Sequence, residues 1–155
     1  MRLDERHQGG PVMSCDSSSE HSNTEVLRTL LAQLGTALDP YYGKSDPSTY
    51  VAMYADAVTA FDPWSNGKLE DAAVEDHVMG FAGRIPSVAY EIVDPRVDLY
   101  GDTAVFAFNV DLTDPTGATV AVWNTTQVHH RMGDVWELVH SHWSFATPPA
   151  EELGV

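Results

Sequence analysis

The chain has 155 residues, 43% of them hydrophobic, which indicates a single folded domain with a buried core. Its formal net charge of -15 argues against binding to nucleic acid or to an anionic membrane. No apolar run approaches the roughly 18 residues of a membrane span, and residues 1–23 lack the apolar stretch of a secretory signal. The sequence has one cysteine, Cys15, which allows no internal disulfide. We therefore expect a cytoplasmic protein.

The first 21 residues are rich in glycine, serine and charge, without apolar periodicity. They predict a flexible polar tail (1–21), followed by one domain over 22–149 and a C-terminal tail over 150–155. The domain opens on Ser22–Glu25, which fits a helix capping box, and leucines at helical spacing run from there to Leu38. We expect this first helix to end or kink at Asp39-Pro40.

The next segment predicts two more helices and a strand. Asp46-Pro47 is a typical helix start, and this second helix should run to about Ala55. A short strand over 57–62 should end at Asp62-Pro63, and an Asn-Gly turn over 64–67 should follow. Asp71 should cap a third helix with an apolar stripe made of Val74, Val78 and Phe81.

After Pro86 the apolar pattern changes from helical spacing to alternation, which is typical of strands. The alternation predicts a strand from Val88, a hairpin over 96–114, and a final hairpin over 120–145 that turns at Gly133-Asp134. Helices followed by an antiparallel meander predict an α+β fold, with the helices on one face of a curved sheet. Such a cone can hold a small molecule at its open end.

The final hairpin carries three of the four tryptophans and four of the seven histidines. If its loop has two residues, Gln127 lies opposite His140, Thr125 opposite His142 and His129 opposite Leu138, so the three histidines share a face. A loop one residue longer places Gln127 on the face of Val139, Ser141 and Trp143, and moves His140 away. A slip of one residue exchanges the faces completely, and the sequence leaves both registers open.

Three histidines on one hairpin also suggest a metal site, but no cysteine or carboxylate stands at a diagnostic spacing from them. We therefore expect no metal. His140 and His142 should form hydrogen bonds across the sheet or at a dimer interface, and His129 and His130 should be partly exposed. The sequence has no glycine-rich phosphate loop and no dinucleotide fingerprint, so we expect no cofactor either.

Three stretches occur in an order that is typical of one family: TAFDPWSNGKLED, VDPRVDLYGD and QVHHRMGDVWELVHSHWSFATP. Over roughly Ser22 to Pro149 the chain resembles the SnoaL-like branch of the nuclear-transport-factor-2-like (cystatin-like) superfamily. In particular it resembles standalone bacterial proteins related to the association (hub) domain of calcium/calmodulin-dependent protein kinase II. The resemblance implies a cone-shaped α+β barrel and a homodimer formed through the outer face of the sheet. It does not imply one activity, because this fold carries many functions.

The resemblance makes Asp62 the strongest candidate for a catalytic residue. In relatives similar to ketosteroid isomerase, an Asp-Pro at this point of the fold supplies the general base, and a carboxylate between Phe61 and Trp64 could exchange protons. Alternatively, Asp62 only caps its turn by accepting backbone N–H groups of Ser65 or Asn66. Those relatives also place an oxyanion-binding tyrosine on the first helix, where this chain has Leu38.

The kinase hub domains carry arginines, which help to bind carboxylates, at the positions that match Gln127 and Trp143. Both arginines are absent here, so the resemblance implies a neutral, aromatic-lined pocket. We expect Asp62 and His140 as its catalytic groups. The side chains expected to line it or bind substrate are Tyr54, Trp64, Trp123, Gln127, His142 and Trp143, for which ordinary core packing is the alternative interpretation.

Three functions remain open at this point. The first is a homodimeric SnoaL-like protein that binds a small apolar or neutral molecule. The second is a cofactor-free lyase, isomerase, cyclase or dehydratase with Asp62 as general base. The third is a non-catalytic oligomerisation module, which would have a filled cone and form larger rings.

Overall fold

A computed structural model describes residues 17–149, with side chains from residue 22 onward. The expected tails, 1–21 and 150–155, lie outside the described residues, except that the backbone of 17–21 belongs to the first helix. The helices are α1 (Ser17–Lys44), α2 (Ser48–Val51) and α3 (Ala72–Met79). The strands are β1 (Tyr54–Phe61), β2 (Leu69–Glu70), β3 (Ala89–Tyr100), β4 (Thr103–Thr113), β5 (Thr119–Met132) and β6 (Val135–Thr147).

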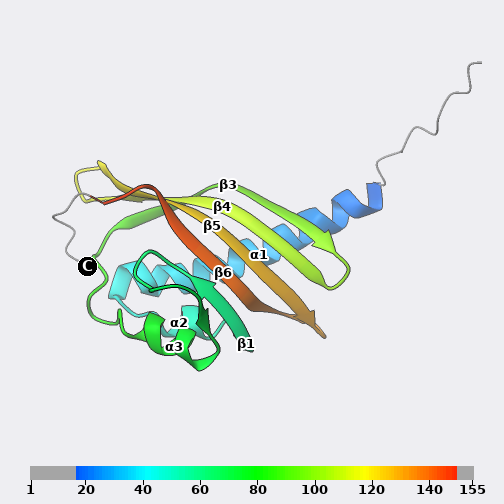
Figure 1. The fold of residues 1–155 in the computed structure, drawn as a ribbon. Helices are drawn as coiled ribbons and strands as arrows, with labels where there is room; N and C mark the ends of the chain where they lie inside the picture. The colour runs from blue at the N-terminus through cyan, green and yellow to red at the C-terminus, as the bar shows by residue number, and fades with distance from the viewer. Residues whose placement is uncertain (1–16, 150–155) are drawn as a thin grey trace, which may run out of the picture.

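The six strands form one curved sheet in the order β2-β1-β6-β5-β4-β3. Strands β3 to β6 are the predicted antiparallel meander, and β1 joins its edge in parallel with β6. Helix α1 runs along one face of the sheet, while α2 and α3 lie together near β1 (Figure 1). The predicted α+β fold is confirmed; the sheet is mixed and stays open, because β2 and β3 are both edges.

The core lies between α1 and the inner face of the sheet. Buried α1 side chains follow helical spacing at Leu30, Leu34, Ala37 and Leu38. They contribute to one apolar cluster with every second residue of β4, which are all buried as the alternation predicts: Ala104, Phe106, Phe108, Val110 and Leu112. Each fully buried leucine or phenylalanine contributes about 1.5–3 kcal/mol.

Helix α1 is longer at both ends than the sequence predicts. It begins at Ser17, so Ser22 is inside the helix and does not cap it, and it continues through Pro40 to Lys44. Proline removes one backbone hydrogen bond from a helix interior. The buried side chains of Ala37, Leu38 and Tyr42 keep both sides of Pro40 packed on the core, and this packing outweighs the local preference of proline.

Helix α2 is shorter than predicted. Asp46 Oδ1 accepts the N–H of Ser48 at 3.0 Å, as expected at a helix start, but the helix ends at Val51. The N–H of Leu138 donates to the carbonyl of Met53 at 2.8 Å, and Tyr54 already pairs with β6. Sheet pairing therefore takes over the segment that the pattern assigned to the end of the helix.

Helix α3 begins where predicted, but Asp71 does not cap it with its side chain. Asp71 Oδ1 instead accepts the N–H of Val58 at 3.1 Å, and the N–H of Asp71 donates to the carbonyl of Val58 at 2.8 Å. These two bonds tie the start of α3 to β1. The short strand β2, which the sequence pattern did not predict, pairs with β1 directly before these two bonds.

The register of the final hairpin follows neither of the two predicted patterns completely. The loop has two residues, because Met132 lies opposite Val135. The pairing then skips one residue: His129 lies opposite Leu138, but Val128 lies opposite His140, which leaves Val139 as a β-bulge. Beyond the bulge the faces exchange, so Gln127 lies opposite Ser141. The prediction that His129, His140 and His142 share a face is therefore wrong.

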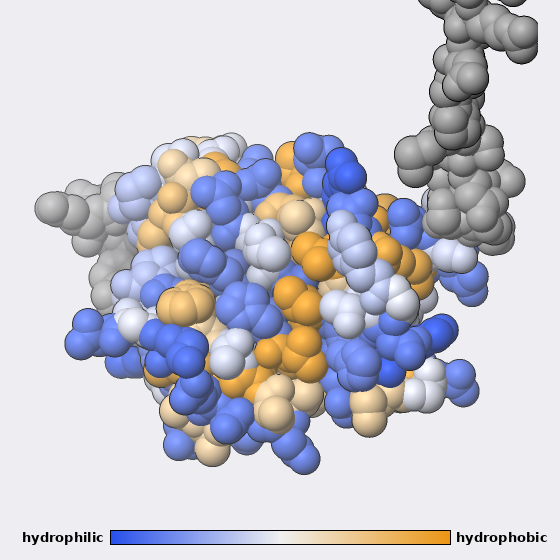
Figure 2. Space-filling view, turned by 45° about the vertical axis from the view of Figure 1, so that its right-hand side comes forward, coloured by the Kyte–Doolittle hydropathy of each residue, from blue (hydrophilic) through white to orange (hydrophobic). Residues whose placement is uncertain are grey.

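The surface mixes polar and apolar residues, and Figure 2 shows orange apolar patches among blue hydrophilic side chains. Large apolar side chains that are exposed include Tyr100, Val135 and Met132 near the two hairpin turns, and Phe61 and Trp64 near the end of β1. Within residues 17–149, no helix combines the length and apolar character that crossing a bilayer requires.

Candidate functional site

A cavity of about 60 Å³, which we call the inner cavity, lies between the sheet and the three helices. Its walls are mostly aromatic and aliphatic. The side chains on it that carry polar groups are Tyr41, Tyr42, Tyr50, Tyr54, Asp62, Trp64, His77, Trp123, Ser141 and Trp143. Of the residues predicted for the site, Asp62, Tyr54, Trp64, Trp123 and Trp143 all lie on this cavity.

Asp62 stands directly after β1 and uses its two carboxylate oxygens differently. Oδ1 accepts the N–H groups of Trp64 at 2.8 Å and Ser65 at 2.7 Å, so the predicted turn-capping role is confirmed. Oδ2 lies 2.5 Å from Nε2 of His77. The two side chains are only 13% and 20% exposed, so this contact is largely shielded from water.

His77 was not among the predicted site residues, although a signal for it exists in the sequence. Together with Val74, Val78 and Phe81 it follows the spacing of one helix face, so a polar residue on an apolar stripe points toward the core. Helix α3 places His77 beside Asp62, because the hydrogen bonds between Asp71 and Val58 hold this helix next to β1. A carboxylate–imidazole pair at a cavity wall can hold and transfer a proton.

A neutral hydrogen-bond chain runs along the other side of the inner cavity. The hydroxyl oxygen of Tyr50 accepts from Nε2 of Gln127 at 3.0 Å and from Nε1 of Trp143 at 2.9 Å. Oε1 of Gln127 lies 2.9 Å from Nε2 of His129, and since a carbonyl oxygen only accepts, His129 donates there. Gln127, expected to bind substrate, is buried at 1% exposure and does not line the inner cavity.

Burial fixes the protonation states of this chain. It raises the pKa of Tyr50, an effect that hydrogen bonds from neighbouring side chains partly oppose, so the phenol keeps its proton. Burial also lowers the pKa of His129 to about 4, which keeps this imidazole neutral, and its exposure of 2% contradicts the expectation of partial exposure. This chain of hydrogen bonds therefore contributes dipoles, and no charge, beside the inner cavity.

His140 and His142 lie on the outer face of the sheet, away from the inner cavity. Nδ1 of His140 lies 2.7 Å from the hydroxyl of Thr59 on β1, which is the cross-sheet hydrogen bond expected from the sequence. Both rings pack against Phe61, with centroids 6.1 and 5.6 Å apart. Burial, and then the neighbouring His142, lower the pKa of His140. The bulge at Val139 is the reason that His140 and His142 face outward.

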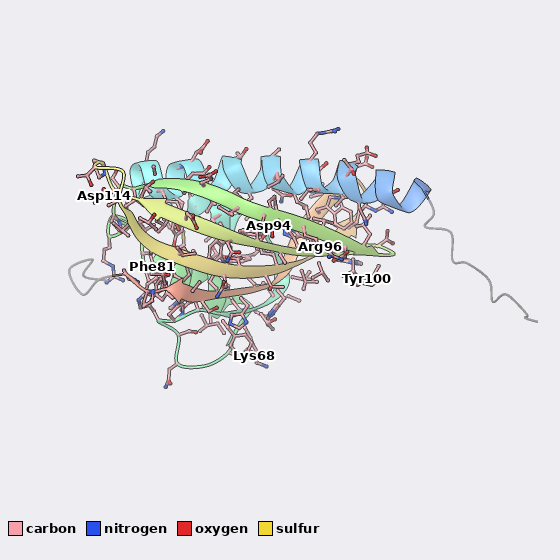
Figure 3. The ribbon with its side chains drawn as sticks, turned by 90° about the horizontal axis from the view of Figure 1, so that it is seen from above. Lys68, Phe81, Asp94, Arg96, Tyr100 and Asp114 are labelled. Atoms are coloured by element: carbon pink, nitrogen blue, oxygen red, sulfur yellow. The ribbon has the colours of Figure 1, made fainter. Side chains whose placement is uncertain are left out.

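A second cavity of about 70 Å³, which we call the lateral cavity, adjoins the inner one. Both are lined by Tyr41, Tyr42, Trp64, Phe81 and Trp123. Phe81 lies toward the end of the molecule that carries Asp114, away from Tyr100 (Figure 3). Trp64 is 39% exposed, and its ring centroid lies 5.4 Å from those of Phe81 and Trp123, so it stands between the two cavities.

The described residues contain no group of three histidine, cysteine, aspartate or glutamate side chains arranged to hold a metal ion. The polar groups that reach the inner cavity are the Asp62–His77 pair, the tyrosine hydroxyls, Ser141 and the indole N–H groups. The site as built can therefore bind through apolar contact and hydrogen bonds, and can exchange a proton at Asp62–His77.

Comparison with solved structures identifies the fold. The association domain of calcium/calmodulin-dependent protein kinase II from C. elegans aligns with a TM-score of 0.63 at 23% identity, covering 83% of this chain and 99% of that one. A candidate ketosteroid isomerase from Parabacteroides distasonis gives 0.61 at 24% identity, with 74% and 86% covered. A candidate dehydratase of the NTF2-like family from Streptomyces avermitilis gives 0.58 at 20% identity, with 79% and 97% covered.

At these identities the structural likeness establishes the NTF2-like fold and nothing about activity. No curated protein matches the sequence significantly. The profile of one family, described as the calcium/calmodulin dependent protein kinase II association domain, matches residues 24–147, which is most of the chain and includes every residue on the two cavities except Pro149. The chain therefore belongs to the calcium/calmodulin-dependent protein kinase II association domain family and has an NTF2-like fold.

Proposed function

We propose that this chain is a small-molecule-binding protein of the SnoaL-like type, and that its ligand occupies the inner cavity beside Asp62 and His77. The observation that carries the proposal is the Asp62–His77 pair on the wall of an otherwise apolar, aromatic cavity. An apolar pocket with a few convergent polar groups is the usual form of a ligand site.

The lining favours a ligand that is apolar or neutral. Among residues 17–149, the only ionisable side chains on the inner cavity besides the tyrosines are Asp62 and His77, and these two face each other. At about 60 Å³ the cavity is much smaller than the roughly 300–1,000 Å³ of typical ligand pockets. The ligand is therefore very small, or it enlarges the cavity by moving Trp64, the most exposed of the surrounding tryptophans.

The same pair supports an enzymatic alternative, a cofactor-independent lyase or isomerase. Two relatives of the fold are a candidate ketosteroid isomerase and a candidate dehydratase, and both names denote chemistry that moves protons. In this chain, Oδ1 of Asp62 is held by two backbone N–H groups, so Oδ2 with His77 is the part of the carboxylate that would take a proton from substrate.

The binding proposal is tested by native mass spectrometry of the protein purified under mild conditions, together with thermal-shift screening of small neutral compounds. We expect a bound molecule, or a stabilising compound, whose binding weakens about tenfold or more in Asp62→Asn. Asp76→Asn is the matched control, because Asp76 is exposed on α3 beside His77 and lines neither cavity. Wild-type protein that retains and binds no compound contradicts the proposal.

The family favours a second candidate function, oligomerisation, because solved relatives are named association or hub domains. The outer face of the sheet suits a flat contact: exposed Ala107 and Thr126 lie opposite each other at its centre, and Val128 and Val105 form the next pair. Sedimentation velocity should then show a homodimer or larger assembly that Thr126→Arg dissociates. Ala32→Arg, on the exposed side of α1, should not dissociate it, and a wild-type monomer at micromolar concentration excludes this function.

A further inference from the structure

The lateral cavity has no role in the function proposed above, yet it is as large as the inner one and more apolar at its floor. Its floor is made by side chains from β4, β5 and β6, namely Leu112, Ala121, Trp123 and Phe145, and its outer wall by the loop after α3. Trp123 and Phe145 stack with centroids 4.0 Å apart, so this floor contains an aromatic pair. Aromatic rings favour ligands with rings of their own, which pack against their faces or edges.

Trp64 is the partition between the two cavities. Its ring touches both walls, with centroid distances of 5.4 Å to Trp123, 5.4 Å to Phe81 and 5.7 Å to Phe145. Among described residues, however, no partner holds its indole by a hydrogen bond, and the side chain is 39% exposed. An indole held by ring contacts alone can be displaced by a ligand that offers the same contacts.

Arg84 lies at the edge of the lateral cavity and is the one lysine or arginine on either cavity in the part of the chain that the structure describes. Its position is set by its neighbours: the N–H of Gly83 donates to the carbonyl of Ser45 at 2.9 Å, and that of Ile85 to the hydroxyl of Ser45 at 2.8 Å. These two bonds fix the backbone on both sides of Arg84 against the end of α1.

The guanidinium of Arg84 has no hydrogen-bond or ion-pair partner among the described residues. Three of the other basic side chains among the described residues are paired: Lys68 with Glu70, Arg96 with Asp98, and Arg131 with Asp102. Arg28 and Lys44 form no ion pair within this part of the chain, but neither of them lines a cavity. A free arginine at the edge of an apolar cavity is complementary to an amphiphile, which would place its apolar part inside and its anionic group at the guanidinium.

We propose that the inner and lateral cavities are two halves of one ligand channel, divided by Trp64, and that this channel binds an elongated amphiphile. Its neutral polar end lies at Asp62 and His77, its apolar, ring-containing body replaces the Trp64 indole against Trp123 and Phe145, and its anionic end pairs with Arg84. The inference rests on ligand binding in the inner cavity, and it places the ligand's charge at the mouth and outside the neutral interior.

Two probes with one aromatic skeleton test this proposal by fluorescence titration. Anilinonaphthalene sulfonate carries an anionic group, and phenylnaphthylamine is its neutral counterpart. We expect wild-type protein to bind both with one site each, and Arg84→Gln to weaken the sulfonate about fivefold while leaving the neutral probe unchanged. Arg28→Gln is the matched control, because Arg28 is exposed on α1, lines neither cavity and removes the same charge.

The partition is tested by Trp64→Ala, with Trp64→Phe as a second variant in case the alanine variant does not fold. Removal of the indole should tighten binding of the neutral probe about threefold, because the ligand no longer has to displace it. Weaker binding in both variants shows that Trp64 is a wall of two separate cavities and overturns the channel.

The outcomes also separate this inference from the proposed function. If Arg84→Gln and Arg28→Gln weaken the sulfonate equally, or if Arg84→Gln weakens both probes, the anionic end at Arg84 is wrong while ligand binding in the inner cavity stands. If wild-type protein binds neither probe, the channel is wrong. If in addition no neutral compound binds in an Asp62-dependent manner, the proposed function fails with it.

Discussion

The carboxylate of Asp62 and the imidazole of His77 meet at 2.5 Å, and they join the end of β1 to α3 at the wall of the inner cavity. The other oxygen of the same carboxylate holds the turn that carries Trp64. One side chain therefore contributes both to the chemistry of the cavity and to the position of the residue that divides it from the lateral cavity. A change at Asp62 acts on both.

The first prediction isolates the contact between Asp62 and His77 by a double-mutant cycle. We expect Asp62→Asn and His77→Gln each to lower the free energy of unfolding by about 1–2 kcal/mol, since each removes a partner of a shielded hydrogen bond. Together they should lose about 1 kcal/mol less than the sum of the single changes, because the pair is lost only once. Urea denaturation measures all four proteins. Additive losses mean that the contact contributes nothing to stability.

The second prediction concerns the bulge at Val139. Deletion of Val139 makes the pairs His129–Leu138 and Val128–His140 consecutive and leaves every later residue on its present face. We expect this deletion to cost about 1–2 kcal/mol, through lost local twist and contacts.

Deletion of Ser141 is the matched comparison. This deletion misplaces core side chains whether or not the bulge is kept: with the bulge, Trp143 and Phe145 move to the outer face, and without it, His140 replaces Ser141 on the inner face. The loss should be about 2–5 kcal/mol, larger than that of the Val139 deletion. Unfolding followed by tryptophan fluorescence distinguishes the two variants. A Val139 deletion as damaging as the Ser141 deletion contradicts the register argument.

The third prediction tests the hydrogen bonds on Tyr50. Trp143→Phe keeps a ring in the core but removes the N–H that donates to the Tyr50 hydroxyl, and we expect a loss of about 1–2 kcal/mol. Tyr50→Phe removes the acceptor from both Trp143 and Gln127, so two buried donors lose their partner and the loss should be larger. Thermal unfolding measures both. A loss in Trp143→Phe that equals the loss in Tyr50→Phe contradicts this order.

Alternation of apolar residues predicted the buried face of β4 correctly, from Ala104 to Leu112, because strand periodicity is a local property. Asp62 was found because the resemblance to ketosteroid-isomerase-like proteins singles out an Asp-Pro at this strand end. The bulge at Val139 could not be predicted: no residue type marks it, and contacts with both neighbouring strands decide it. Because the sequence pattern does not show this bulge, His140 and His142 were expected in the pocket.

Long-range contact also explains the residues that the sequence analysis missed. His77 shares the spacing of the α3 stripe, but only the fold brings α3 to Asp62. Arg84 follows no periodic pattern, and its place at the lateral cavity depends on bonds to Ser45, far away in the sequence. The end of α1 was misplaced because proline is a strong local signal, which the burial of Leu38 and Tyr42 overrides.

The fourth prediction follows from Pro40. Proline inside α1 removes a backbone hydrogen bond, so Pro40→Ala should raise the free energy of unfolding by about 1–2 kcal/mol, after allowing for the greater freedom of the unfolded chain. Pro115→Ala is the control, because Pro115 is exposed in the turn between β4 and β5, and it should lose up to about 0.5 kcal/mol. Urea denaturation measures both. A destabilised Pro40→Ala means that proline fits this position without cost.

The last prediction concerns the pH dependence of stability through His129. Burial lowers its pKa from 6.5 to about 4, so between these values the unfolded chain binds a proton that the folded chain does not. Stability should therefore fall as the pH is lowered from 6.5 to 4, by up to about 3 kcal/mol, and this contribution should change no further below pH 4.

Carboxylates also titrate in this range, so the measurement must isolate the histidine. His129→Gln keeps an N–H for Oε1 of Gln127 but cannot titrate, and the difference in stability between wild type and this variant should shrink as the pH falls from 6.5 to 4. A constant difference for His129→Gln would contradict this prediction, because it would show that His129 takes up a proton equally readily in the folded and the unfolded protein. The burial of His129 on the inner face of the sheet, beside Phe106 and Gln127, argues for the opposite result.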